Sequence, residues 1–185
     1  TIHAVPEVAG DIYISGNRAF GLYYFSLDGA KAYINMMNKA QERFNGIATI
    51  YDILAPTSVG IGLDDEAQKA INSSNQKEAF DLIFENLNEN IKKVSIFDTL
   101  KAHNSEYIYF NTDHHWTALG AYYAYEEFCK VKGITPTPID EYQKVEYPNF
   151  LGSFYASSNQ SPALAANPDT LIGYIPKSTN SMVYY

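Results

Sequence analysis

Two adjacent histidines follow an aspartate near the middle of the chain, in the segment Asn111–Thr117, which reads Asn-Thr-Asp-His-His-Trp-Thr. In an extended stretch, residues two apart project to the same side, so Asp113 and His115 are expected to face one cleft while His114 points elsewhere. A carboxylate beside an imidazole fixes the tautomer of the ring and stabilises the imidazolium. The pair is therefore suited to act as orienting acid and general base for a nucleophile.

Two other interpretations of the same residues stay open at this point. A lone Asp-x-His on a loop is commonly a hydrogen-bonded turn, and His114 is expected to be a packing or surface residue. Asp113 and His115 could also be two metal ligands, with His3 or His103 as a third. Because metal sites usually place more ligands close together in the sequence, we expect neither a metal nor another cofactor.

The motif lies between two elements that would position it. Tyr107–Phe110 is predicted to be a short aromatic strand, and Thr117 to cap a helix that runs to about Lys132 and stops at Gly133. Loops at the ends of strands in α/β sheets are where sites are usually built.

Upstream, the periodicity predicts alternating strands and helices. The expected elements are a hairpin of Ile12–Ile14 and Ala19–Tyr24, a helix from Leu27 to about Asn45, a buried strand at Ile47–Leu54, helices at Asp65–Ile71 and Lys77–Asn90, and a strand that begins at Val94. This order predicts βαβ units and a mostly parallel sheet. Residues 135–176 hold six of the eight prolines and are expected to form an irregular flap or insertion with short strands.

The composition excludes several classes of protein. Of the 185 residues, 46% are hydrophobic and 18% are charged, which is typical of one globular domain. The formal net charge of −8 without a basic cluster argues against a nucleic-acid partner. The single cysteine, Cys129, excludes an internal disulfide framework, and no apolar run approaches the roughly 18 residues that a membrane span needs.

The motif and its surroundings resemble the DHHW protein family. Asp113–Trp116 gives the signature itself, and Gly120–Tyr125 follows it in the same context. Weaker similarities lie at Ile12–Ile14, at Leu54–Ser58 and at Gly152–Ser157, so the resemblance covers about residues 11–160.

That family is similar to the alginate O-acetyltransferases of the SGNH-hydrolase superfamily. The resemblance implies a three-layer α/β/α fold and a Ser-His-Asp triad, with Asp113 as orienting acid and His115 as general base. It further implies an extracytoplasmic acyltransferase or esterase acting on O-acetyl groups of an exported polysaccharide, with a membrane protein as a partner that supplies the acyl donor.

The nucleophile of such a triad is not recognisable in this chain. The enzymes that the family resembles carry the serine in a Gly-Asp-Ser-like turn downstream of the Asp-x-His element, and no Gly-Asp-Ser occurs here. The serines that follow the motif are Ser153, Ser157, Ser158, Ser161, Ser178 and Ser181. The chain also ends in a strand-like Met182–Tyr185, which is consistent either with a terminal edge strand or with a domain that continues. We expect a single SGNH-like domain over residues 1–185 that is incomplete.

Aromatic residues suggest where a sugar would bind. The chain has 16 tyrosines and 10 phenylalanines, and tyrosine offers both a flat apolar face and a hydroxyl group. Tyr147, Phe154 and Tyr155 in the irregular region are the predicted substrate contacts. The alternative function is a non-catalytic surface or carbohydrate-binding protein that keeps the fold, and a metal-dependent hydrolase is a third possibility.

Overall fold

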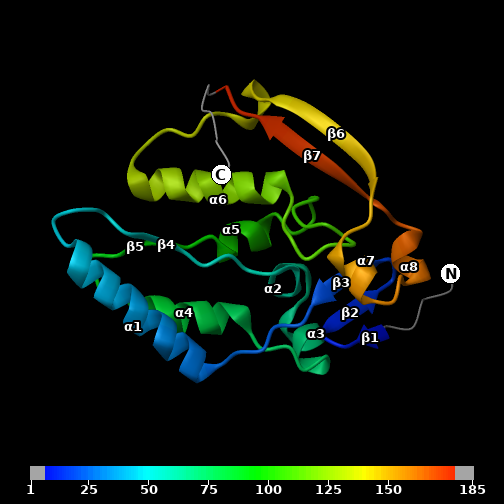
Figure 1. Cartoon of the computed structure of the whole chain (residues 1–185), viewed down its shortest axis with the longest axis horizontal. Coiled ribbons are helices and arrows are strands. Elements are labelled where there is room, and N and C mark those ends of the chain that lie inside the picture. Colours follow the sequence, from blue (N-terminus) through cyan, green and yellow to red (C-terminus); the bar gives the residue numbers. More distant parts are fainter. Residues whose placement is uncertain (1–6, 178–185) are drawn as a thin grey trace, which may run out of the picture.

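The N-terminal part of the chain forms a small antiparallel sheet (Figure 1). In the computed structural model, which describes residues 7–177, its strands are β1 (Glu7–Ala9), β2 (Ile12–Ser15) and β3 (Arg18–Gly21), in that order. Gly16 has a φ of 62° in the tight turn between β2 and β3, a backbone conformation that favours glycine. The predicted hairpin is confirmed, although its second strand ends at Gly21 rather than at Tyr24.

A parallel pair of strands, β4 (Tyr51–Ile53) and β5 (Lys92–Val94), lies between two layers of helices. One layer holds α1 (Leu27–Phe44) and α4 (Gln76–Asn86), and the other holds α6 (Ala118–Lys132) with α5 (Phe97–Ala102) against it. The short helices α2 (Ser58–Gly62) and α3 (Asp65–Ala70) connect β4 to α4. This is the predicted three-layer α/β/α arrangement, with parallel pairing limited to β4 and β5 among the described residues.

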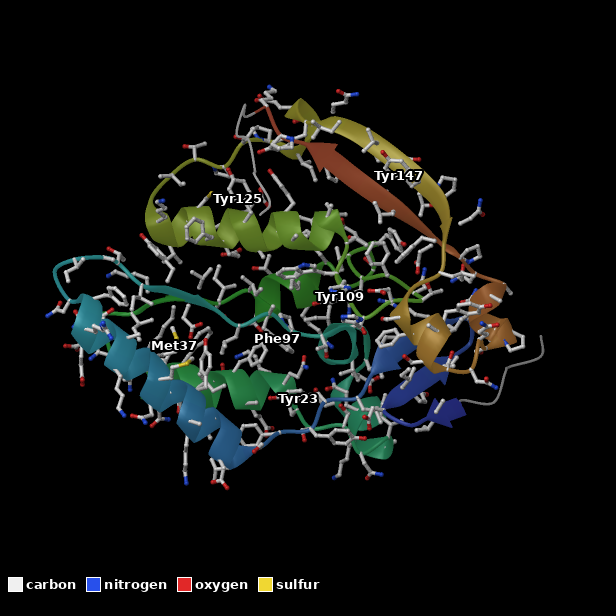
Figure 2. All side chains as sticks on the ribbon, in the orientation of Figure 1. Tyr23, Met37, Phe97, Tyr109, Tyr125 and Tyr147 are labelled. Carbon is white, nitrogen blue, oxygen red and sulfur yellow. The ribbon has the colours of Figure 1, made fainter. Side chains whose placement is uncertain are left out.

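Each layer of helices has its own apolar core. On the α1 and α4 side, the buried residues are Ala30, Ile83, Leu87 and Ile91. Figure 2 shows Met37 on α1, one of the partly buried side chains that pack against this cluster. On the other side, Val94, Leu100, Ile108 and Ala124 are buried between β5, α5 and α6.

Caps set the helix boundaries where the sequence predicts them. Ser26 Oγ accepts the N–H of Gly29 at 3.1 Å at the start of α1, and Thr117 Oγ1 accepts the N–H of Gly120 at 3.3 Å at the start of α6. Gly133 has a φ of 75° and ends α6. The site motif is therefore followed directly by a capped helix of 15 residues.

The C-terminal region is more regular than its prolines suggest. It contains the 3-10 helix η1 (Ile139–Glu141), the strands β6 (Gln143–Phe150) and β7 (Asp169–Ile175), and the short helices α7 (Ser153–Ser157) and α8 (Pro162–Ala165). β6 and β7 form an antiparallel ladder, which corrects the expectation of an irregular segment with short strands. The prolines are compatible with it: Pro148 lies at the register shift of β6, and Pro168 precedes β7.

Two other boundaries differ from the prediction. The apolar run Ile47–Leu54 contributes only three residues to β4, and Phe97, expected in a strand, is instead the first residue of α5. Tyr107–Phe110 makes a single bridge, from Tyr109 to Trp116. Phe97, Ile108, Tyr109 and Phe110 are buried although they are not in strands, because a short apolar run does not distinguish a buried strand from a buried helix or loop. The run Ile47–Leu54 differs in burial as well, because Ile47 is 78% and Ile53 is 39% exposed.

None of the described helices combines the length and the hydropathy needed to cross a membrane.

Candidate functional site

Asp113 and His115 form an acid–base pair on a tight loop. His115 Nδ1 lies 2.7 Å from Asp113 Oδ1, and the backbone N–H of His115 donates to the same oxygen at 2.9 Å. The backbone on either side is tied together, because the N–H of Thr117 donates to the carbonyl of Ile108 at 2.9 Å. Asp113 is 6% exposed, whereas the side chain of His115 is 64% exposed. The carboxylate thus holds Nδ1 and leaves Nε2 on the open side of the ring.

The start of α7 holds the second oxygen of Asp113. The backbone N–H of Ser153 donates to Asp113 Oδ2 at 2.8 Å, and the N–H of Gly152 donates to Thr112 Oγ1 at 3.1 Å. A Cβ atom on Gly152 would overlap the Asp113 side chain and would lie 2.7 Å from its Cγ. Only glycine allows the two segments to approach this closely.

These contacts keep the carboxylate ionised. Burial alone would raise the pKa of Asp113, but the backbone N–H groups of Ser153 and His115, together with the His115 ring, outweigh burial and lower that pKa to about 2. At neutral pH Asp113 is therefore an anion that can accept the Nδ1–H of His115. A neutral His115 ring in this tautomer has its lone pair on Nε2, where it can take a proton.

His114 lies beside this pair, and the expectation that it points elsewhere is wrong. Its ring centroid is 3.8 Å from that of His115, and its Nδ1 is 2.6 Å from Ser153 Oγ. Its backbone N–H also donates to Ser153 Oγ, at 3.3 Å. Residues 111–115 form a series of bends rather than an extended strand, so the alternation of side chains does not apply to them.

Asp169, the first residue of β7, anchors the segment before the motif. It is 2% exposed, and its carboxylate accepts the O–H of Tyr107 at 2.6 Å, the N–H of Asn111 at 2.8 Å, and both the N–H and the hydroxyl of Thr112, at 2.7 and 2.6 Å. Sequence analysis missed this residue, because nothing in the sequence links an aspartate after Pro168 to a motif 56 residues earlier.

The predicted substrate contacts lie in different environments. Tyr147 is 62% exposed on β6, where Figure 2 labels it. Phe154 is 6% exposed and packs in a core cluster with Ile12 and Ile14, beneath the site. Tyr155 packs against that cluster and donates its backbone N–H to the carbonyl of Thr112 at 3.1 Å. Phe154 and Tyr155 therefore lie in or against the core next to the site and hold its backbone in place. Tyr147 has no described contact with the site.

A metal ion would have to compete with bonds that are already made. Donor atoms of Asp113, His114 and His115 lie within 4.8 Å of one another, which is a spacing that a cation could bridge. Both Asp113 oxygens, however, already accept N–H groups. His103, one of the two predicted third ligands, instead lies 2.6 Å from Glu106, and His3 lies outside the described residues.

No serine hydroxyl is hydrogen-bonded to His115 within residues 7–177. Ser153 Oγ contacts His114 instead, Ser158 and Ser161 are buried, and Ser157 is exposed. Ser178 and Ser181 lie outside the described residues.

Comparison with known proteins identifies the family. A family model described as DHHW protein matches residues 3–184. The chain belongs to the DHHW family. A crystal structure of a DHHW family protein from Eubacterium siraeum DSM 15702 is similar, with 27% sequence identity and a TM-score of 0.85, over 96% of this chain and 58% of that one.

More distant solved structures share the fold of this DHHW protein. Bacillus cereus PatB1 matches at 18% identity with a TM-score of 0.67, over 94% of this chain and 59% of its own. PatB1 with a sulfonyl adduct matches at 16% identity with a TM-score of 0.71, over 94% and 58%. The search of curated proteins found no match. These similarities confirm the predicted α/β fold. The chain spans less than two thirds of the length of these relatives.

Proposed function

We propose that this chain supplies the general base and the orienting acid of a serine-dependent acyl-transfer site. The observation that carries the proposal is the Asp113–His115 pair, in which a buried, ionised carboxylate lies 2.7 Å from Nδ1 of a largely exposed imidazole. An imidazole held in this way has a fixed tautomer and an outward lone pair, which is what a general base for a hydroxyl nucleophile requires.

In the proposed reaction His115 Nε2 removes the proton of a serine hydroxyl while the serine oxygen attacks an ester carbonyl. Asp113 stabilises the imidazolium that forms and does not itself take the proton. The imidazolium then protonates the leaving oxygen, and the cycle repeats with water or a sugar hydroxyl as the second nucleophile. The resemblance to alginate O-acetyltransferases suggests that the ester is an O-acetyl group of an exported polysaccharide.

Location and partner follow from that substrate and are part of the proposal. A polysaccharide modified after export requires an enzyme outside the cytoplasm or in the cell envelope. An acetyltransferase there needs an acyl donor, which we propose a membrane protein delivers. Esterase activity would need no such partner, so the dependence on a donor distinguishes the two reactions.

The test uses a sulfonyl fluoride on the whole protein that contains this chain. A sulfonyl adduct is recorded for PatB1, and such an adduct forms when an activated nucleophile displaces fluoride from the sulfur. We expect intact-mass spectrometry to show one adduct, and peptide mapping to locate the serine. His115→Ala should abolish the adduct and lower p-nitrophenyl acetate hydrolysis by roughly 10³-fold or more.

His103→Ala is the matched control, because His103 is bonded to Glu106 and is not part of the site. It should leave labelling and hydrolysis unchanged. An adduct that forms equally fast in His115→Ala would rule out His115 as the base.

One observation favours a second function. Because no serine hydroxyl contacts His115 within the described residues, the fold could serve carbohydrate binding without catalysis. That function predicts no adduct on the whole protein, together with saturable binding of a polysaccharide that His115→Ala leaves unchanged.

A further inference from the structure

His114 and Ser153 form a second polar pair directly beside the acid–base pair. The two imidazole rings lie at 38° to each other with centroids 3.8 Å apart, and the side chain of His114 is 55% exposed. A surface histidine without a role would be free to rotate, but this ring is fixed at one nitrogen by a hydroxyl at 2.6 Å.

The partner of Nδ1 affects which nitrogen of His114 carries the proton, and that partner is Ser153. Ser153 Oγ accepts the backbone N–H of His114 at 3.3 Å and lies 2.6 Å from its Nδ1, and the same side chain is also a hydrogen-bond partner that lowers the pKa of Asp113. A hydroxyl has one proton and two acceptor sites, so it can donate that proton to Nδ1 while it accepts the N–H. In that arrangement a neutral His114 carries its proton on Nε2. His115 has the opposite tautomer, because Asp113 accepts its Nδ1–H.

We propose that His114 is a second substrate-facing residue of the site, a neutral imidazole whose Nε2–H donates a hydrogen bond to the oxygen of the acyl group. The two exposed rings thus present complementary atoms side by side: an acceptor on His115 and a donor on His114. A neutral imidazole can stabilise a developing oxyanion as a donor without giving up its proton. This inference rests on the proposed acyl-transfer function.

The step balances without proton transfer by His114. The serine oxygen forms a bond to the acyl carbon, its proton passes to His115 Nε2, and the carbonyl π electrons move to the carbonyl oxygen. That oxyanion accepts the hydrogen bond from His114 Nε2–H. When the oxyanion collapses, the ester C–O bond breaks, the leaving oxygen takes the proton from His115, and His114 keeps its own.

The first test needs no activity. In the chain labelled with 15N-histidine, long-range proton–nitrogen NMR above pH 8 should show His114 as the Nε2–H tautomer and His115 as the Nδ1–H tautomer. Ser153→Ala should shift the Nδ1 resonance of His114 and leave the tautomer of His115 unchanged. A His114 protonated on Nδ1, as when Ser153 donates to Asp113 instead, would overturn the proposal.

The second test uses the whole protein and its ester hydrolysis. His114→Phe keeps a ring but has no N–H, and we expect kcat to fall roughly 10²-fold with KM nearly unchanged, as for the loss of one oxyanion donor. His114→Gln places an amide N–H near the position of Nε2 and should recover most of that loss. His103→Phe is the control and should behave as wild type.

The outcomes separate the two proposals. If His115→Ala abolishes hydrolysis while His114→Phe does not lower kcat, only the role of His114 fails. If His115→Ala has no effect, the acyl-transfer function itself fails. If His114→Gln is as impaired as His114→Phe, the Nε2–H is not the group that matters, and the role as donor is refuted.

Discussion

At the scale of single residues, the site depends on one position that has no side chain. Gly152 packs against Asp113 so closely that a Cβ atom would overlap the carboxylate. Gly152→Ala should push α7 and Asp113 apart, misplace His115, and lower the hydrolysis rate by roughly 10²-fold. The control is Gly29→Ala in α1, where the added carbon would meet only Ser26, at 3.4 Å. Equal rates for the two variants would show that the close approach is not needed.

Asp113 also links stability to pH. Its pKa in the folded state is about 2, below its ordinary value of 3.8, so it contributes stability above about pH 4 and loses that contribution as the pH falls toward 2. Between pH 5 and pH 2 the free energy of unfolding of wild type, measured in urea, should therefore fall. Asp113→Asn cannot titrate at this position, so its free energy of unfolding should not show this part of the fall. Parallel pH curves for the two proteins would contradict the lowered pKa.

At the scale of elements, one carboxylate joins β7 to the segment that leads into the motif. Asp169→Ala would leave the buried N–H and hydroxyl of Thr112, and the half-buried donors of Tyr107 and Asn111, without their acceptor. Each unsatisfied buried group costs about 1–3 kcal/mol, so the two groups of Thr112 should lower the free energy of unfolding by at least about 2 kcal/mol in urea titrations.

Asp81→Ala is the matched control for that variant. Asp81 is half-exposed and pairs with Lys77 on α4, a kind of contact worth about 0–1 kcal/mol. If both substitutions cost the same, Asp169 is not the anchor that its hydrogen bonds indicate.

The elements that the sequence predicts well are those specified by neighbouring residues. Ser26 and Thr117 mark helix starts, and Gly16 and Gly133 mark a turn and a helix end. The Asp113–His115 contact, between residues two apart, was also predicted, and the structure places the two side chains together.

Features that depend on distant pairing could not be predicted in this way. The β6–β7 ladder spans a connection that contains two helices, and prolines weaken its strand signal. The same holds for Asp169 and for the contact of Ser153 with His114, which joins residues 39 apart. Local patterns carry no information about which distant hydroxyl or carboxylate will arrive at the site.

At the scale of the whole molecule, the single cysteine reports on cooperative unfolding. Cys129 lies on α6 and is fully buried. Its thiol should be unreactive toward a disulfide reagent under native conditions, and it should react in urea with a midpoint equal to that of unfolding followed by circular dichroism. Reaction at a lower urea concentration would show that α6 opens before the remainder of the fold.

The contact between Ser153 and Asp113 has a consequence for the order of events during synthesis. The Asp-His-His-Trp motif lies within residues 113–116, yet the N–H that holds the second oxygen of its aspartate comes from a residue 40 positions later. Contacts over such separations form only after the intervening chain has been closed into a loop. A ribosome-bound chain that ends at residue 150 would contain every residue of the motif and still lack an oriented base. The acid–base pair should therefore appear late, when the second half of the chain folds back onto the first.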